Sequence, residues 1–195
     1  MRPRRIILLG LLLTAVGCTT TPSKSPYQTL LQPTRSAQRA REANEQGLHL
    51  VEQGDAPRAE ASFRQALAHD PGCAAAHGNL GLILLEKRLF YEAAIEFSLA
   101  RKLAPRAIEP RLNLARLYQC VGWHRLAISE CEAALELEPD HPEVFGRLAE
   151  ATLRLGKTDP RLDAWLAALA RQSAAEDWHT WAEEQLATRH RQEDE

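Results

Sequence analysis

Small, bulky and helix-breaking residues recur along most of this 195-residue chain at intervals of 34 positions. One column holds alanine four times, and a second holds only glycine or alanine. A third column carries a bulky or apolar residue, and a fourth carries proline in three of its four places. Such a period is typical of proteins in which one supersecondary unit is repeated and stacked. The columns are Ala66, Ala100, Ala134 and Ala168; Gly47, Gly81, Ala115 and Ala149; Phe63, Phe97, Cys131 and Trp165; and Pro71, Pro105, Pro139 and Ser173.

Each unit is predicted to contain two helices joined by a turn. The first helices are expected to begin near residues 40, 74, 108 and 142. A turn glycine follows in three units, and Arg88 takes its place in the second unit. The second helix ends before the column proline, because proline cannot continue a helix. Since one such unit cannot bury its apolar face alone, the units should stack into an all-α solenoid.

Two segments carry this pattern most fully. They are HGNLGLILLEKRLFYEAAIEFSLARKLAP, from His77, and RLNLARLYQCVGWHRLAISECEAALELEP, from Arg111. In spacing and residue type they resemble the tetratricopeptide repeat family. The resemblance implies a right-handed solenoid of about four helix pairs within residues 38–173. The pairs would be residues 40–73, 74–107, 108–141 and 142–173, and the last departs from the pattern at Pro160 and Arg161.

A final helix is predicted at residues 174–190. Ser173 and Glu176 have the spacing of a capping box, and apolar residues then recur at three- and four-residue steps. A solenoid needs such a helix to cover the exposed end of its stack. Trp178 and Trp181 lie on its apolar stripe and could instead form a docking patch for a partner. Residues 191–195 are expected to be disordered.

The first residues of the chain have the pattern of a secretory signal. Three arginines precede an apolar stretch of only 12 residues, from Ile6 to Gly17, which is too short to span a membrane. The stretch AVGC that follows resembles the lipobox of bacterial lipoproteins, although Ala15 stands where leucine is preferred. The resemblance implies a lipoprotein signal peptide at residues 1–17 and acylation, such as palmitate, on Cys18. The alternative is an ordinary cleaved signal with an incidental cysteine.

A tether is predicted between the lipobox and the repeats. Residues 18–37 are rich in Thr, Ser and Pro and show no helical period. The segment YQTLL, at residues 27–31, is more apolar than a spacer and could dock on the folded part. Because Thr19 follows Cys18 where an aspartate would retain the protein, the resemblance implies the outer membrane of a bacterial envelope, with the repeats facing the periplasm.

Charge argues against a nucleic-acid partner. The chain has 24 basic and 26 acidic residues, and three of the basic ones lie within residues 1–17. A chain cleaved after Gly17 would be mildly acidic, whereas phosphate binding requires a basic surface.

Candidate catalytic and metal motifs are incomplete. The stretch GKT at residues 156–158 ends like a phosphate-binding loop, but Ala151 stands where a glycine is required. No two histidines have the spacing of a zinc-binding helix. We therefore expect no enzyme, metal or cofactor. Cys131 is expected in the core, and a disulfide between Cys120 and Cys131 is disfavoured because their expected axial offset exceeds one helical turn.

The first helices of the units are expected to line a concave groove. Asn79 and Asn113 are 34 residues apart, and their amides could bond the backbone of an extended peptide or could simply be solvated. The leucines favour an apolar strand or an amphipathic helix, and YQTLL is an alternative occupant. A clamp for a terminal carboxylate, known in some relatives, is not expected, because only Asn113 and Arg147 fit it. The expected groove residues are Asn44, Leu48, Val51, Asn79, Leu82, Leu85, Leu112, Asn113, Arg116, Arg147, Glu150 and Leu153.

These features indicate a non-catalytic, lipid-anchored scaffold that binds an envelope protein or peptide. The architecture resembles the pilus-biogenesis lipoproteins called pilotins, which assist a secretin complex of the type IV pilus, although those have about six repeats. An adaptor that recruits peptidoglycan-remodelling or outer-membrane assembly factors is the alternative, and an enzyme is the least favoured class. Nothing in the sequence fixes the oligomeric state.

Overall fold

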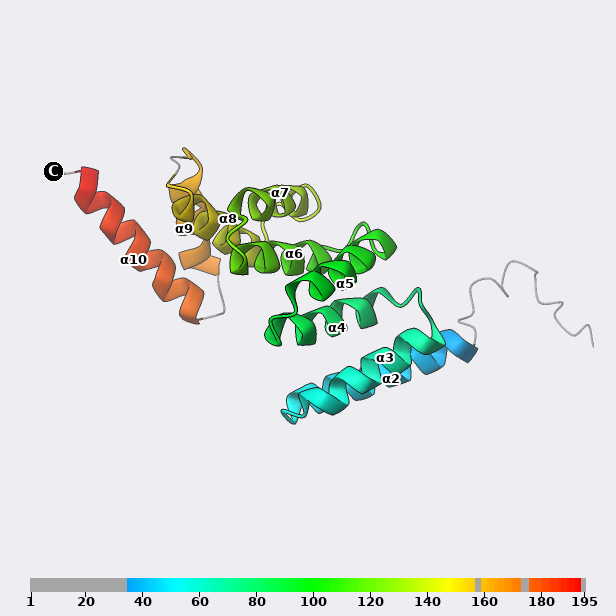
Figure 1. Cartoon of the computed structure of the whole chain (residues 1–195). Coiled ribbons are helices and arrows are strands. Elements are labelled where there is room, and N and C mark those ends of the chain that lie inside the picture. Colours follow the sequence, from blue (N-terminus) through cyan, green and yellow to red (C-terminus); the bar gives the residue numbers. More distant parts are fainter. Residues whose placement is uncertain (1–34, 157–158, 173–175, 194–195) are drawn as a thin grey trace, which may run out of the picture. The chain divides into compact units, whose positions relative to one another are not determined.

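The computed structural model describes residues 35–156, 159–172 and 176–193, and all of its regular structure there is α-helical (Figure 1). The predicted signal peptide, Cys18 and nearly all of the tether lie outside these residues. The predicted all-α solenoid fold is confirmed. The helices are α2 (Arg35–Glu52), α3 (Ala56–His69), α4 (Ala74–Glu86), α5 (Phe90–Leu103), α6 (Glu109–Cys120), α7 (His124–Leu135), α8 (Pro142–Arg154), α9 (Leu162–Gln172) and α10 (Glu176–Glu193).

Consecutive helices form pairs, and each pair stacks on the next. Contacts are densest within α2–α3, α4–α5 and α6–α7, and α8 packs on α9 in the same way. The pairs meet through α3–α4, α5–α6 and α7–α8. Thr34–Glu195 is one compact unit. The hydrophobic core clusters formed by its described residues lie between Ala40 and Leu186. None of the described helices combines the length and the hydropathy needed to cross a bilayer.

The column of small residues marks the closest approach between the two helices of a pair. A Cβ atom built on Gly81 would lie 2.5 Å from the Phe97 ring, and one built on Gly47 would also clash with the Phe63 ring. Phe63 and Phe97 are themselves almost fully buried. The small and the bulky columns are therefore two sides of one contact, and that contact requires glycine wherever phenylalanine faces it.

The turn column has a backbone conformation that favours glycine. Gly54, Gly122 and Gly156 have φ angles of +76°, +77° and +61°. Arg88 has φ +60° at the same place in the second pair, as its position in the 34-residue register predicts. A side chain in this left-handed region is strained.

Helix α10 packs on the last helix pair as the predicted cap. The Trp178 ring packs against Gly146, and a Cβ atom built on that glycine would lie only 2.9 Å from the ring. Ala182 is fully buried. Trp178 and Trp181 meet edge to face with ring centroids 5.4 Å apart and pack against the same core. This packing favours the cap over the docking-patch alternative. The Ser173 part of the predicted capping box lies outside the described residues.

The predicted end of α10 at residue 190 is wrong, because the helix continues to Glu193. Arg189 Nε lies 2.6 Å from Asp163 Oδ1 of α9, and its guanidinium also donates to Oδ2. This ion pair holds the last turns of α10 against α9. Residues 191–193 are therefore helical rather than disordered.

Candidate functional site

The first helices of the four pairs form a continuous face, which we call the first-helix surface. Along it α2 contacts α4, α4 contacts α6, and α6 contacts α8. The sequence-predicted groove residues all belong to these four helices. The structure separates them into three groups: a central hollow, an exposed apolar edge, and residues that are buried or already paired.

A hollow of 410 Å³ lies between α4 and α6, and we call it the asparagine hollow because Asn79 and Asn113 both line it. Gly78 opens the backbone of α4 to this space, since no atom lies within 4 Å of a Cβ built there. Glu109 supplies the one carboxylate. The remaining lining is small and apolar: Ala74, Ala75, Ala104, Ala107 and Pro110.

Asn44 orients Asn79 from the preceding helix pair. The Nδ2 atom of Asn79 donates to Oδ1 of Asn44 at 2.9 Å, and Asn44 is itself buried. Asn79 retains a second N–H and its carbonyl oxygen, while Asn113 bonds to no other described side chain. An amide can both donate to and accept from a peptide backbone. Asn79 and Asn113 together can therefore bond a backbone segment, whereas Asn44 is a support beneath them.

The α2 end of the first-helix surface is an exposed apolar edge. Leu48 and Val51 leave nearly half of their surface in solvent. Leu82 of α4 is half-buried against the core, and Arg116 of α6 is exposed. These residues can extend a binding surface away from the asparagine hollow.

Leu85 and Leu112 are core residues, which corrects their prediction as groove residues. Each is only 6% exposed, Leu85 within the N-terminal core cluster and Leu112 within the C-terminal one. A first helix packs against its own partner and against both adjoining pairs. Its apolar stripe is therefore wider than that of a surface helix with one neighbour, and the two leucines lie within it.

Arg147 is also unavailable to a ligand, because it is already paired. Its guanidinium donates to Glu143 Oε1 at 2.6 and 3.0 Å and to Gln119 Oε1 at 3.0 Å. Gln119 Nε2 in turn donates to Glu150 Oε2 at 3.1 Å. Leu153 and Glu150 line a separate hollow of 290 Å³ beside Trp181 of α10. The structure therefore does not bring these α8 residues into the asparagine hollow.

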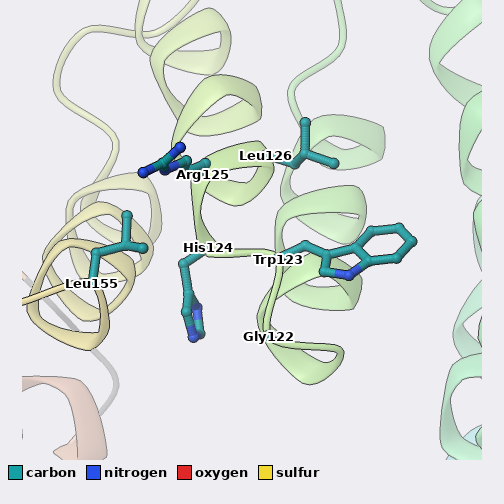
Figure 2. A pocket seen from close by; sticks show the side chains of 6 residues that line it. All are labelled: Gly122, Trp123, His124, Arg125, Leu126 and Leu155. Carbon is teal, nitrogen blue, oxygen red and sulfur yellow. The ribbon is translucent and has the colours of Figure 1, made fainter.

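Sequence reasoning missed an exposed turn at the start of α7. Gly122 to Leu126, together with Leu155 from the next turn, line a hollow of 490 Å³ (Figure 2). The Trp123 ring is 58% exposed, points away from Leu155 in Figure 2, and lies 6.0 Å from the Tyr118 ring. The sequence signal that could have found this turn is a tryptophan directly after a turn glycine.

Two buried groups that could carry chemistry, His77 and Cys131, have structural roles instead. The ring of His77 lies 2.6 Å from Glu96 Oε2 and 3.0 Å from the Pro71 carbonyl oxygen, and so joins α4 to α5. Burial raises the pKa of the Cys131 thiol to about 12, so it is not a nucleophile at neutral pH. Within the described ranges, no three His, Cys, Asp or Glu side chains are placed to hold a metal ion.

Comparison with known proteins agrees with this geometry. Residues 44–108 match the sequence profile of the tetratricopeptide repeat family. The described fold is an all-α solenoid like those of tetratricopeptide proteins. The matched segment begins within α2, covers α3, α4 and α5, and includes Asn44 and Asn79. No curated protein sequence matches the chain.

Solved structures of this fold class superpose on most of the chain. PilF of Pseudomonas aeruginosa is 19% identical with a TM-score of 0.72, over 82% of this chain and 72% of that one. The first tetratricopeptide domain of Spaghetti (RPAP3), bound to the HSP90 peptide SRMEEVD, is 21% identical with a TM-score of 0.59, over 62% and 96%. MamA is 17% identical with a TM-score of 0.59, over 83% and 87%.

Proposed function

We propose that this protein is a non-catalytic scaffold that binds a segment of a partner protein on its first-helix surface. The asparagine hollow carries the proposal: Asn79 and Asn113 present amides to one space, beside a helix backbone that Gly78 leaves open. The RPAP3 domain, which has the same fold class, is bound to a peptide in its solved structure. Leu48 and Val51 would add apolar contact at the α2 edge.

The chemistry of the surface favours a neutral or basic segment. Glu109 borders the hollow, and the guanidinium of Arg147 is neutralised by Glu143. An acidic chain end, such as that of the HSP90 peptide bound by RPAP3, would meet a carboxylate here and no open cation within the hollow. A backbone held by the two asparagines, with a cationic side chain near Glu109, fits this charge pattern.

We further propose that a lipid on Cys18 anchors the scaffold in a bacterial envelope, at the outer membrane and facing the periplasm. The lipobox-like AVGC stretch supports this proposal. The similarity to PilF over most of the chain favours a role in assembling a type IV pilus or secretin complex.

Affinity capture tests the binding function. The bait is Thr34–Glu195, and the source is detergent-solubilised envelope. In the test variant, Gly78→Leu fills the hollow and Asn113→Ala removes an amide. Ser129→Leu, on the exposed face of α7, is the control. We expect a partner that is retained by the wild type and the control and lost from the test variant. Equal retention of the partner by all three baits would exclude the asparagine hollow as its binding site.

Metabolic labelling tests the anchor separately. Cells expressing the full chain are supplied with labelled palmitate, and we expect label in the wild type and none in a Cys18→Ser variant. Recovery of the wild-type chain in the membrane fraction without label would contradict lipidation, and it would leave the binding proposal intact.

A further inference from the structure

Helix α5 carries an apolar stripe on its outer face. Tyr91, Ile95 and Leu99 lie at four-residue steps and are 77%, 43% and 38% exposed. They border a shallow hollow of 640 Å³ together with Ala94, Ser98 and Lys102, and Arg101 at its margin. This face belongs to a second helix of a pair, so it is separate from the asparagine hollow.

The stripe is particular to α5 among the second helices. The residues 34 positions earlier, in α3, are Pro57, Ala61 and Gln65. The residues 34 positions later, in α7, are Arg125, Ser129 and Ala133. The solenoid therefore does not need large apolar groups at these positions, since its other pairs are built without them. Exposed groups of this size on a soluble surface mark an interaction site.

The pattern of large and small residues on this face is self-complementary. When two copies of α5 lie antiparallel about a two-fold axis between Glu96 and Phe97, Leu99 faces Ala94 of the other copy, and Ile95 faces Ser98. Tyr91 then lies beside Lys102. Each bulky residue thus meets a small one, as interdigitating helix faces require, and the arrangement maps the stripe onto itself, as a two-fold interface demands.

Charge along α5 agrees with the same arrangement. Glu92 lies in its first turn, and Arg101 and Lys102 lie in its last turn. Antiparallel pairing brings the acidic end of one helix to the basic end of the other and opposes the two helix dipoles favourably. A parallel arrangement would place like charges together. In this register Arg101 faces Glu92, but Arg101 already pairs with Glu130 of α7 in its own chain. Lys102, the next residue along, is therefore the cation that we expect to pair with Glu92 of the other copy.

We propose that a second copy of this chain covers the α5 stripe, in an antiparallel two-fold dimer. The contact extends over one 14-residue helix, or about 21 Å. That length places the interface at the small end of specific interfaces, so the dimer is reversible, with a dissociation constant on the order of tens of micromolar. The dimer presents two asparagine hollows, and it does not require that they be occupied.

Sedimentation velocity of Thr34–Glu195 tests the dimer, over a series from about 2 to 200 µM. We expect reversible dimerisation of the wild type. Ile95→Glu with Leu99→Glu should raise the dissociation constant at least about 100-fold, because two buried apolar side chains become charged. Leu48→Glu with Val51→Glu makes the same exchange on α2 and should leave the dimer intact. Circular dichroism checks that all the chains are equally helical.

A charge exchange tests the orientation. Glu92→Lys alone should weaken the dimer, and adding Lys102→Glu should restore it, since each new charge then meets its opposite across the axis. Absence of restoration would overturn the antiparallel arrangement. A wild type that stays monomeric at the highest concentration would overturn the dimer, as would a dimer that survives the Ile95 and Leu99 exchange. Binding of the monomer to phosphatidylglycerol vesicles through this stripe would assign it to a membrane surface instead.

Discussion

At the scale of single residues, the strained turn at Arg88 shows how strictly the repeat is built. Its φ of +60° matches the three turn glycines, yet it carries a full side chain. Its guanidinium lies 5.8 Å from the centroid of the Phe90 ring, a weak attraction for an exposed group. The free-energy cost of the strained backbone at Arg88 therefore exceeds the stabilisation from this contact with Phe90.

Arg88→Gly should stabilise the protein by about 1 kcal/mol, because glycine adopts positive φ without a Cβ clash. The melting temperature should rise by roughly 2–4 °C in a unit of this size. Glu86→Gly, two residues earlier at the last position of α4, is the matched control and should lower it, because glycine has a lower helix propensity than glutamate. A fall in melting temperature for Arg88→Gly would mean that the arginine contributes a contact worth more than the strain.

Two glycines on α4 should respond oppositely to alanine. Gly81→Ala places a methyl group against the Phe97 ring, and overpacking of this kind costs about 1–3 kcal/mol. Gly78→Ala meets no atom within 4 Å and gains helix propensity, so it should stabilise α4 by up to about 1 kcal/mol. Urea unfolding of the two variants measures the difference. Equal effects would contradict the assigned helix contact.

The buried thiol of Cys131 should make stability depend on alkaline pH. Its pKa is raised by burial from 9.0 to about 12, so above pH 9 the unfolded chain loses this proton while the folded chain keeps it. The free energy of unfolding should therefore fall as pH rises from 9 toward 12, by at most about 1.4 kcal/mol per pH unit from this group.

Cys131→Ala removes that contribution and leaves a small apolar side chain at this buried position. Urea unfolding at pH 7 and at two values above pH 9, with reductant present, compares the variant with the wild type. The variant should lose less stability between neutral and alkaline pH. Parallel losses in the two chains would mean that the thiol is not protected from titration.

At the scale of elements, the helix pairs follow directly from the 34-residue register. Alanine, glycine and phenylalanine in fixed columns specify which residues meet between two helices, so the pairing could be predicted. The end of α10 could not, because HRQEDE is charged and has no apolar period. Its last turns are held by the ion pair between Arg189 and Asp163, a contact between two helices that no local pattern reveals.

The binding residues could be predicted only in part, for a related reason. The register placed Asn79 and Asn113 on one face, and they do line one hollow. It could not separate Leu85 and Leu112 from the exposed leucines, because their burial depends on the third helix that packs beside them. Nor did it reveal that Gln119 and Glu143 engage Arg147.

Trp178 should contribute most of the attachment of α10. Its ring fills the space beside Gly146 and is half-buried, so Trp178→Ala should cost about 2–3 kcal/mol, less than a fully buried tryptophan. Trp123→Ala removes an equally large but mainly exposed ring and should change stability by less than about 0.5 kcal/mol. Urea unfolding followed by far-ultraviolet circular dichroism compares the two. Similar losses would contradict the capping role of α10.

At the scale of the whole compact unit, the fold presents two surfaces with different chemistry. The first-helix surface offers amides, small side chains and one carboxylate around the asparagine hollow. The outer face of α5 offers large apolar groups between an acidic and a basic end. A repeat built only for stability needs neither, since hollow and stripe both lie outside the core.

The central claim is that the asparagine hollow binds a partner protein, and site-specific photo-crosslinking in cells tests it most directly. A photoreactive amino acid replaces Ala75, which lines the hollow and contributes no amide side chain, and a second chain carries it at Ser129 on α7. The account predicts one discrete adduct from position 75, none of that size from position 129, and loss of the adduct when Gly78→Leu fills the hollow. No adduct from position 75, or the same adduct from both positions, would contradict it.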